Sequence, residues 1–397
     1  MSAPNPIAIV LDGNQRAALA TVRSLGRRRI SVVVAENTTG SLAGASRYCS
    51  EQLVYPDAGT FPAAFVEWLE SLARRFPGAV LLPVTDLTVP LVLQAAERFP
   101  GLRLGLPTLA AYESVTDKFR LYETAVALGV RVPQTSSVGR QDLASLRERG
   151  LVFPLVAKPR LSTLRADSGV AKRPVRYAAN IDELVRIAEE ELAGAADDLL
   201  LQQYVAGYGA GIFGLYARGA PLCFFAHRRL RERPPSGGVS VLSESIAPPH
   251  EALASARRIL ESRPWHGVAM VEFKVDAQGN CWLIEVNARF WGSLQLAVDC
   301  GADFPWFVYQ LATGQAPDVP QRFAQGRRLR WWLGDLDNLY GQLRQRALGA
   351  GPWQLARAAA SFAIPWLPGM RYELLRWNDP WPAYTSLRHY MNALVKR

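Results

Sequence analysis

The chain has 397 residues, of which 49% are hydrophobic and 20% charged, as is typical of a folded globular protein with two or three domains. The formal net charge is +10, but the arginines stand in small separate groups, so nucleic acid is not expected as a partner. Four cysteines without a Cys-x-x-Cys pair argue against a disulfide framework and a structural zinc site. Neither a secretory leader nor a transmembrane-length apolar run is recognisable, and we expect a cytoplasmic protein.

The first part of the chain, residues 1–110, alternates short apolar runs with helical stretches. This rhythm predicts a Rossmann-like domain, in which helices cover a parallel β-sheet. The turn that begins at Asp12 follows the first strand, where open α/β sheets place ligands. The expected strands are Ile7 to Leu11, Ile30 to Ala35, Ala79 to Leu82 and Leu102 to Gly105, and the expected helices are Gln15 to Leu25, Phe61 to Arg75 and Val89 to Phe99.

A second unit is expected over residues 111–315. Ser114 and Asp117 form a capping pair that predicts a helix start, and Asn180 with Glu183 forms another. Further expected elements are an apolar strand over 152–158, a polar loop over 159–176, a buried strand over 199–205, strands over 211–226, a loop over 228–240 and a helix over 250–263.

The last part, residues 316–397, is enriched in Trp, Arg and Leu. Amphipathic helices are predicted at Gly334 to Ala347 and at Trp353 to Phe362, which makes this part a mainly helical C-terminal extension. Tryptophan together with arginine suits a segment that packs on a core, forms a dimer interface or lies on an anionic membrane. Packing on the core is the simplest interpretation, and a homodimer and peripheral membrane contact stay open.

Two strand-like runs, residues 270–276 and 281–289, predict a β-hairpin. Because strand side chains alternate between two faces, Glu272 on one strand and Glu285 and Asn287 on the other should share a face. Such oxygen ligands suit Mg²⁺ that is bound together with phosphates. A hairpin with one solvated face is the alternative. The opposite face is expected to be apolar, with Val271, Phe273, Val275, Trp282, Ile284 and Val286.

Five motifs occur in this order: Asp117-Lys118, Val156-Ala-Lys158-Pro159, Gln202-Gln-Tyr-Val-Ala-Gly207, Glu272 and Glu285-Val-Asn-Ala-Arg289. Their order and spacing resemble those of the ATP-grasp family of carboxylate-amine and carboxylate-thiol ligases. The resemblance covers residues 110–310, and the preceding α/β unit is similar to the N-terminal partner usual in that family. Within the family, the chain looks most like bacterial ATP-grasp proteins distantly similar to carbamoyl-phosphate synthase and biotin carboxylase.

The resemblance implies a site for ATP. Lys158, at the end of a buried strand, would offer a point charge to the α- and β-phosphates, and Lys118 would help to close the site. For either lysine alone, an exposed surface position is the alternative. The segment 201–207 would be the hinge between two subdomains and would read the adenine edge with backbone groups. The residues expected to bind ATP are Lys118, Lys158, Gln202, Gln203 and Val205.

The resemblance also implies that Glu272, Glu285 and Asn287 hold one or two Mg²⁺ ions that bridge the β- and γ-phosphates. Arg289 would stabilise the transferred phosphoryl group or the substrate carboxylate. A surface ion pair of Arg289 with Glu272 or Asp276 is the alternative.

The expected loop over residues 228–240 supplies two further catalytic candidates, Arg231 and Ser236, which would bind an anionic substrate; a solvated basic loop is the alternative. The chain also contains a glycine pattern that resembles a dinucleotide-binding motif. Residues 209–214 match G-x-G-x-x-G, but a strand-like run follows instead of a helix, so a dinucleotide site is not expected. Many family members carry an acid for the ribose near residues 207–209, where this chain has Gly, Tyr and Gly, so the ribose contact is not identified.

The implied reaction is ATP-dependent activation of a carboxylate as an acyl phosphate, followed by attack of an amine on a small molecule or amino acid. A bicarbonate-using carboxylase or carbamoyl-phosphate-like enzyme stays open as an alternative, as does a non-catalytic ATP-binding module. The expected partners are small-molecule carboxylate and amine substrates. The expected fold is an ATP-grasp fold of α/β and α+β class, with a Rossmann-like pre-ATP-grasp domain before it and the helical extension after it.

Overall fold

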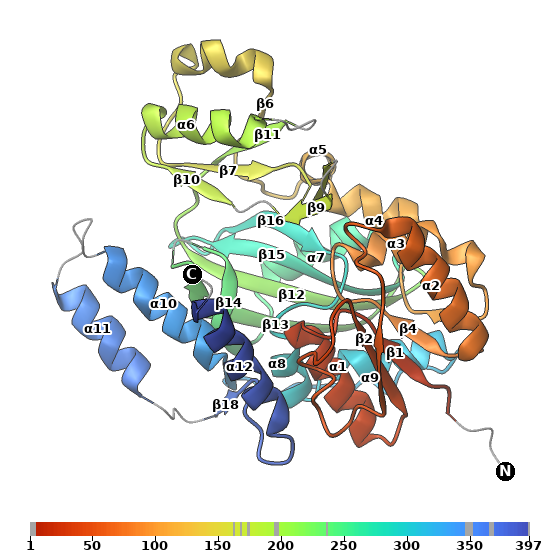
Figure 1. Cartoon of the computed structure of the whole chain (residues 1–397). Coiled ribbons are helices and arrows are strands. Elements are labelled where there is room, and N and C mark those ends of the chain that lie inside the picture. The colour runs from red at the N-terminus through yellow and green to blue at the C-terminus, as the bar shows by residue number, and fades with distance from the viewer. Residues whose placement is uncertain are drawn as a thin grey trace.

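The computed structural model consists of three β-sheets, a small separate hairpin and flanking helices (Figure 1). It describes residues 5–161, 163–166, 169–172, 175–193, 198–235, 237–345, 352–364 and 369–395. The largest sheet lies in the centre of this view, with the N-terminal sheet beside it and the smallest of the three sheets above it. The mixed α/β and α+β class predicted from the sequence is confirmed.

A parallel sheet forms the N-terminal part of the fold. Its elements are β1 (Ala8–Val10), α1 (Arg16–Arg27), β2 (Val32–Glu36), β3 (Glu51–Val54), α2 (Pro62–Arg75), β4 (Val80–Leu82), α3 (Thr88–Gln94), a short 3₁₀ turn (Ala96–Arg98) and β5 (Arg103–Leu104). The strand order is β3-β2-β1-β4-β5, and every pairing is parallel. The sequence pattern does not predict β3, because this edge strand alternates half-buried and exposed side chains and has no continuous apolar run.

The smallest of the three sheets is antiparallel, in the order β10-β7-β11-β6. Its strands are β6 (Thr135–Val138), β7 (Leu155–Pro159), β10 (Arg176–Ala178) and β11 (Leu199–Gln203). A 3₁₀ helix (Arg140–Glu148) and α6 (Ile181–Leu192) connect them along the chain. The Asn180 side chain caps α6 as predicted, since its Oδ1 accepts from the Glu183 N–H at 3.0 Å. The polar loop expected over 159–176 is wrong: it contains the hairpin β8 (Thr163–Ala166) and β9 (Gly169–Lys172). These two strands pair with each other and form a separate sheet.

The largest sheet has the order β16-β15-β12-β13-β14-β17-β18. Its strands are β12 (Tyr208–Ala217), β13 (Ala220–Arg233), β14 (Val239–Ile246), β15 (Gly267–Val275), β16 (Cys281–Asn287), β17 (Arg328–Arg330) and β18 (Met370–Tyr372). The loop expected from residue 228 is a wrong prediction, because β13 continues to Arg233. Cross-strand pairing explains how a run of arginines can be part of a sheet: the Arg228 Nε donates to Glu244 on β14 at 2.7 Å.

Helices cover the largest sheet and join it to the N-terminal sheet. They are α4 (Leu109–Thr116), α5 (Lys118–Ala127), α7 (His250–Glu261), α8 (Leu294–Asp299) and α9 (Phe304–Ala312). One apolar core contains Leu25 of α1, Phe213 of β12 and Phe304 of α9, so the two sheets are packed together. The predicted capping role of Ser114 is wrong. Its hydroxyl donates to Ala111 O inside α4, and Asp117 alone caps α5.

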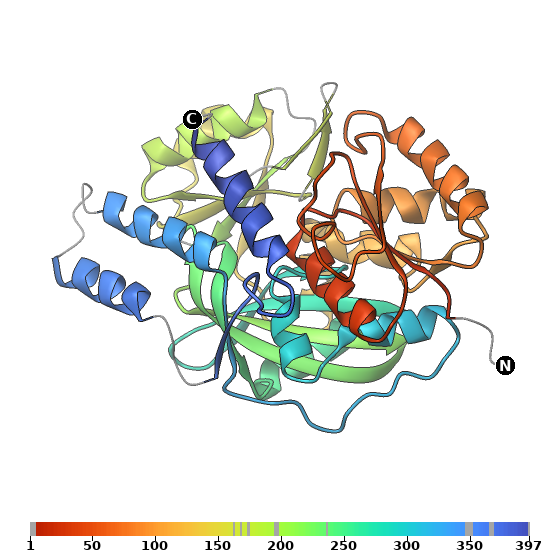
Figure 2. The ribbon, with the colours of Figure 1, turned by 60° about the horizontal axis from the view of Figure 1, so that its bottom comes forward.

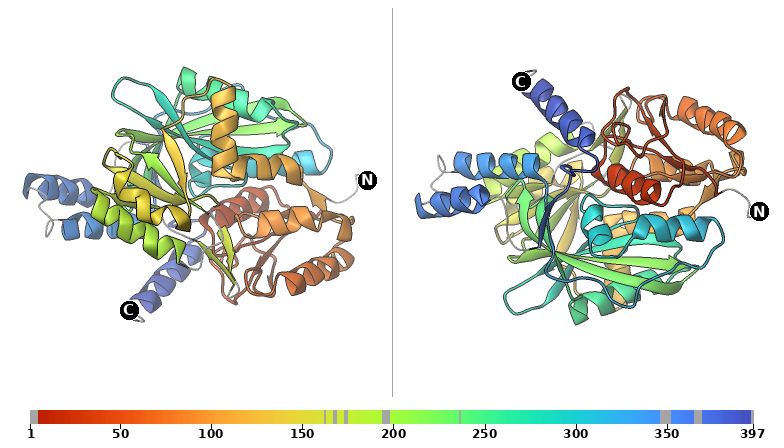
Figure 3. Two further views of the ribbon diagram at one scale, coloured as in Figure 1. Left: turned by 90° about the horizontal axis from the view of Figure 1, so that it is seen from above. Right: turned by 90° about the horizontal axis from the view of Figure 1, so that it is seen from below.

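The C-terminal part contains α10 (Trp332–Gln345), α11 (Pro352–Ala363) and α12 (Trp381–Val395). The first two match the predicted amphipathic helices, although the predicted end of the first, Ala347, lies outside the described residues. This part is not only helical, because β17 and β18 extend the edge of the largest sheet. The helices α10 and α11 project at the left of Figures 2 and 3, whereas α12 lies across the body in Figure 2 and projects at an angle to them in Figure 3. Among the described helices, none has the length and apolar character that crossing a bilayer requires.

A buried ion pair attaches the C-terminal part to α1. Arg23 is 1% exposed, and its Nε donates to Asp379 Oδ2 at 2.8 Å. Replacing Arg23→Met would leave the Asp379 carboxylate buried without a cation. We expect this to lower the free energy of unfolding by about 3–5 kcal/mol in urea titrations followed by circular dichroism.

The control for this prediction is Arg75→Met. Arg75 pairs with Glu51 at the surface, where the two side chains are 54% and 37% exposed. Because exposed ion pairs are screened by water, we expect a loss of about 1 kcal/mol or less. Equal losses in the two variants would contradict a role for the buried pair in holding the C-terminal part.

Candidate active site

The hairpin of β15 and β16 brings the three predicted oxygen ligands together. Glu272 stands directly opposite Glu285, and Met270 stands opposite Asn287. The Asn287 Nδ2 donates to Glu272 Oε1 at 2.9 Å and to Glu285 Oε1 at 3.3 Å. Glu272 is 9% exposed and Asn287 is 8% exposed, and Glu285 is half-buried.

The opposite face of the hairpin differs from the predicted one at two positions. A β-bulge shifts the register between Glu272 and Phe273, so that Leu283 pairs with Phe273 and Cys281 with Val275. Leu283 and Cys281 are therefore buried in the apolar core, in place of the predicted Ile284 and Trp282. Strict alternation along the strand could not reveal this, because one extra residue reverses the face of every residue before it.

Two buried lysines approach the carboxylates from other elements. Lys158 lies near the end of β7 and is 3% exposed, and Lys118 opens α5 and is 5% exposed. The surface position considered for each lysine is therefore excluded. The Lys158 Nζ donates to Gln202 Oε1 on β11 at 2.7 Å and to the Tyr122 hydroxyl on α5. Tyr122 in turn donates to Ile284 O on β16 at 2.6 Å, which links the lysine to the carboxylate hairpin.

The electrostatics of the cluster reflect the competition between burial and opposite charge. Burial lowers the pKa of Lys158 to about 8, although the nearby Glu285 and Glu272 carboxylates favour its charged form. Burial also lowers the pKa of Lys118. For Glu285, burial alone would raise the pKa, but the ammonium groups of Lys118 and Lys158 outweigh it and leave that pKa below its ordinary value. Burial raises the pKa of Glu272, with only partial compensation from the Arg229 guanidinium.

Residues 204–207 connect the smallest of the three sheets to the largest, between the end of β11 and the start of β12. The Gln203 backbone N–H donates to Gln134 O at 2.8 Å, and a contact of the Gln203 backbone with adenine stays a prediction. Val205, half-buried in the connection, stays a prediction. Gly207 has φ +153°, and a Cβ there would stand 2.1 Å from Val275 O, so this position of the hinge excludes any side chain, an acid for the ribose included.

Gln202 is buried and contacts Lys158, and its own contact with ATP stays a prediction. Its Oε1 accepts from Lys158, and its Nε2 donates to the Thr135 hydroxyl at 2.9 Å. These two bonds fix the orientation of the amide, because they use its acceptor and one donor. The structure therefore makes Gln202 a residue that positions Lys158.

Arg289 pairs with a residue that the sequence pattern does not single out. Its Nε and Nη2 donate to the two carboxylate oxygens of Asp86, both at 2.7 Å, and its Nη2 also donates to Asn287 Oδ1 at 2.8 Å. The ion pairs with Glu272 or Asp276 that the sequence left open are not formed. Asp276 instead accepts from Asn280 and from the Trp282 indole within the hairpin.

Asp86 lies in the loop after β4, and Asp12 holds that loop. The Asp12 carboxylate accepts from the Val84 N–H at 2.9 Å and from the Thr88 hydroxyl at 2.6 Å. Burial raises the pKa of Asp12 to about 6. The sequence predicted a ligand near the turn after β1. In the structure, Asp12 of this turn instead orders the loop after β4, whose Asp86 contacts Arg289.

Asp86→Asn should test this link. The amide cannot form the two-pronged, charge-assisted contact, so Arg289 would lose its fixed orientation. We expect the rate of ATP-dependent phosphate release to fall about 10- to 100-fold, while the dissociation constant for ATP changes less than about threefold. Initial rates and calorimetric titrations would measure the two quantities. A larger effect on ATP binding than on the rate would contradict the proposed orientation of Arg289.

Arg229 on β13 is a second site residue that the sequence pattern misses. Its Nη2 forms an ion pair with Glu272, although β12 separates the strands that carry them. Gly209 and Gly211 on β12 make this possible. A Cβ at Gly209 would stand 3.0 Å from Arg229 Cδ, and one at Gly211 would stand 2.9 Å from His227 Nε2. These glycines belong to the G-x-G-x-x-G match of residues 209–214, and their role in the structure is to leave room for side chains of β13.

The two catalytic candidates from the expected loop do not join this cluster. The Arg231 Nη2 pairs with Asp335 on α10 at 2.8 Å, and its Nη1 donates to Ser361 on α11 at 2.8 Å. A strand replaces the expected loop, Arg231 contacts the C-terminal helices, and its catalytic role stays a prediction. Ser236 lies outside the described residues.

The residues present fit a magnesium ion that takes part of its coordination from phosphates. No cluster of three or more His, Cys, Asp or Glu side chains suited to a metal occurs in the described ranges. Two carboxylates and one amide are, however, the small hard-oxygen set that Mg²⁺ uses beside water and phosphate oxygens. Asn287 now directs its nitrogen to the carboxylates. Rotation of the amide would present its oxygen instead and would break the contact with Arg289.

Residues 195–333 match the family described as "ATP-grasp in the biosynthetic pathway with Ter operon". This range includes the hairpin with Glu272, Glu285 and Asn287, and it excludes Lys118 and Lys158. No protein with a curated description matches the sequence significantly.

The fold is similar to that of several solved structures. L-amino acid ligase from Bacillus licheniformis has a TM-score of 0.60 at 18% identity, with 79% of this chain and 75% of the ligase covered. The biotin carboxylase domain of 2-oxoglutarate carboxylase from Hydrogenobacter thermophilus, solved with MgADP, ADP and bicarbonate, has a TM-score of 0.62 at 18% identity, with 82% and 73% covered. N5-carboxyaminoimidazole synthetase from Staphylococcus aureus, complexed with ADP, has a TM-score of 0.60 at 14% identity, with 82% of each chain covered. These likenesses confirm the predicted ATP-grasp fold.

Proposed function

This chain is an ATP-grasp protein by its fold, and from that premise we propose that it is an ATP- and Mg²⁺-dependent carboxylate-amine ligase. It would activate a carboxylate as an acyl phosphate and pass the acyl group to an amine on a small molecule or amino acid. The similar solved structures include a ligase that is named for amino acids and complexes with ADP or MgADP, which supports this choice of substrate class and cofactors.

The observation that carries the proposal is the meeting of buried opposite charges in one place. Lys118 and Lys158 arrive from α5 and β7, and Glu272, Glu285 and Asn287 arrive from the β15–β16 hairpin. Buried charges are costly unless they are paired or serve a ligand. A polyphosphate that carries a divalent cation would pair with both kinds of charge. The lysines would bind the phosphate oxygens, and the carboxylates would bind the cation.

In the first step, an oxygen of the substrate carboxylate would attack the γ-phosphorus of ATP. The bond from that phosphorus to the β,γ-bridging oxygen breaks, and ADP leaves. Phosphoryl transfer depends mainly on positioning and on neutralising charge. Lys158 is suited to both tasks, because Tyr122 and Gln202 hold two of its three N–H donors and leave one for a phosphate oxygen. Mg²⁺, held by Glu272, Glu285 and Asn287, would neutralise charge on the phosphates.

In the second step, the amine would attack the acyl carbon, and inorganic phosphate leaves, so that the products are an amide, ADP and phosphate. Most N–H groups of Arg289 donate to Asp86, Asn287 and Phe290 O. Arg289 would therefore act mainly as a fixed positive charge near the transferred phosphoryl group. The buried Nε–H of Arg229 has no partner among the described residues and could donate to an anionic substrate oxygen.

The test is a screen of phosphate release from ATP and Mg²⁺ with pairs of amino acids and other small carboxylates and amines. We expect release that requires both a carboxylate and an amine, and a product whose mass is the sum of the two minus water. Chelation of the metal should stop it. Phosphate release without any such product would count against the ligase.

A bicarbonate-using carboxylase is the second candidate, because solved structures of similar fold include carboxylases, and two of these contain bicarbonate. Repeating the screen in buffers purged of carbon dioxide, with and without added bicarbonate, separates the two. Release that depends on bicarbonate would favour the carboxylase. Tight binding of MgATP without turnover for any pair would favour a non-catalytic ATP-binding module.

A further inference from the structure

The C-terminal helices α10 and α11 project from the body of the molecule at the left of Figures 1 to 3, and α12 lies near them, across the body in Figures 1 and 2 and projecting at an angle to them in Figure 3. The first two pack against each other as a helical hairpin. The hairpin is attached through Arg231 and Arg330, which bond to Asp335, Ser361 and the Phe362 carbonyl. The attachment leaves the outer faces of these helices uncovered.

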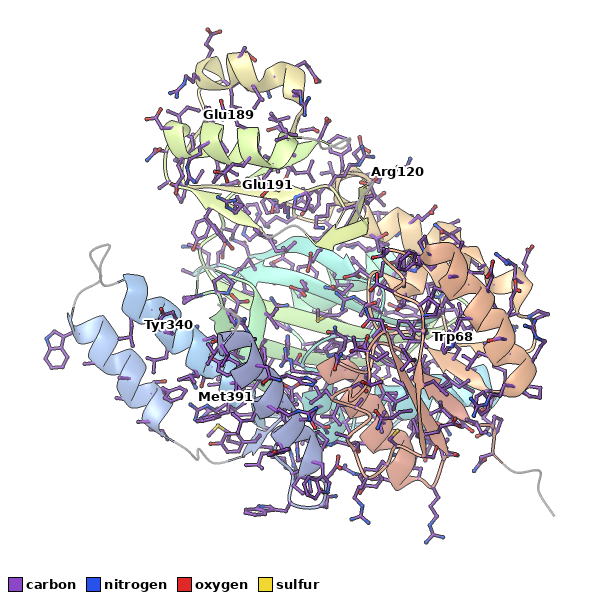
Figure 4. All side chains as sticks on the ribbon, viewed as in Figure 1. Trp68, Arg120, Glu189, Glu191, Tyr340 and Met391 are labelled. Carbon is purple, nitrogen blue, oxygen red and sulfur yellow. The ribbon has the colours of Figure 1, made fainter. Side chains whose placement is uncertain are left out.

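Large apolar side chains are concentrated on these uncovered faces. Trp353 is 85% exposed, and Trp377, before α12, is 93% exposed. Figure 4 labels Tyr340 on the projecting helix α10 and Met391 on α12, both left of the centre of the view. On α12, Tyr384, Leu387, Met391 and Leu394 recur at helical spacing, so one face of this helix is an apolar stripe. Further large apolar residues that are exposed in the described portion of this part are Trp332, Leu343, Ile364, Leu375, Trp381 and Val395.

The two acids of α10, Asp335 and Asp337, pair with Arg231 and Arg233 of β13, and the stretch that follows them carries only positive charge. From Asn338 to Tyr372 the sequence contains Arg344, Arg346, Arg357 and Arg371 and no aspartate or glutamate. On α12, Arg388 is also exposed. Exposed tryptophan and leucine beside arginines without acids are the composition of helices that lie in the interface of an anionic membrane.

We propose that α10, α11 and α12 dock this protein onto an anionic lipid surface, with the exposed tryptophans inserted among the headgroups. Arginines near a negatively charged leaflet are attracted to it, and the exposed apolar side chains gain by leaving water. A second copy of the chain is the poorer occupant. A symmetric interface would place the same acid-free, arginine-containing stretch opposite itself, and like charges oppose such contact.

The test is sedimentation of the full-length protein with vesicles. We expect binding to phosphatidylcholine vesicles that contain phosphatidylglycerol and much weaker binding to pure phosphatidylcholine. Binding should weaken as salt is raised from about 0.05 M to 0.5 M, because salt screens the attraction. Trp353→Ala with Trp377→Ala should weaken binding about tenfold, and Arg357→Glu about fivefold or more.

Phe61→Ala is the matched control. Phe61 is an aromatic side chain, 59% exposed, at the start of α2 and far in sequence from the C-terminal helices, so its loss should leave vesicle binding unchanged. Because Trp353 and Trp377 are exposed, the double variant should stay folded, which circular dichroism would verify. Three results would overturn the proposal: no binding to the anionic vesicles at low salt, equal loss in the control, or a solution dimer that the tryptophan substitutions dissociate.

Discussion

Glu285→Gln should lower the rate of ATP-dependent phosphate release by about 10²- to 10³-fold and leave the protein folded. Glu285 lies among Lys118, Lys158 and Asn287, and its charge balances the two buried lysines. Glutamine has the same size and can still accept from Asn287, but it cannot supply the negative charge that a divalent cation requires. Initial rates in the most active substrate mixture would measure the loss.

Glu261→Gln is a suitable control for this variant. Glu261 is exposed on α7 and pairs with Arg257 at 2.7 Å, so its charge is screened by water and the rate should change less than about twofold. The melting temperature of Glu285→Gln should fall by only a few degrees, since the lysines can lose protons to compensate. Unchanged turnover in Glu285→Gln would refute the assignment of Glu285 to the metal site.

Lys158→Met should weaken ATP binding about 100-fold at neutral pH. Lys158 is buried, and its ammonium is oriented by Gln202 and Tyr122, so methionine preserves the shape and removes the charge. The same residue predicts a pH dependence. Its pKa of about 8 is below the ordinary lysine value, and phosphates bind the protonated form. Wild-type affinity for ATP should therefore be level below about pH 8 and fall above it, by up to tenfold per pH unit.

Calorimetric titration with ATP across this pH range would measure both effects. The Lys158→Met variant should show a flatter profile above pH 8, because the titrating group has been removed. Lys274→Met provides the control. Lys274 is half-buried on β15, in the hairpin that carries the carboxylates, and its Nζ lies 3.5 Å from a carboxylate oxygen of Glu232. Affinity within about threefold of wild type is expected for it. A wild-type affinity that rises between pH 8 and 9 would contradict the role of Lys158.

The local parts of the site could be predicted because they depend on short-range patterns. Alternation along two adjacent strands places Glu272, Glu285 and Asn287 on one face, and a short hairpin connection makes the strands neighbours. The capping signal at Asn180 and the apolar periodicity of α1 likewise involve residues only a few positions apart. Local errors arose where the pattern was interrupted, as at the β-bulge beside Glu272.

The sequence by itself determined the ATP-grasp fold class, the order of its motifs and the metal-binding candidates, since periodicity, turns and motif spacing are properties of neighbouring residues. Only the tertiary structure decided which charges meet. Arg289 pairs with Asp86, Arg229 reaches Glu272 over Gly209, and Arg231 contacts the C-terminal helices. These contacts join residues separated by long stretches of chain or by an intervening strand. Their partners follow from strand order and from the packing of separate sheets, which no local pattern specifies.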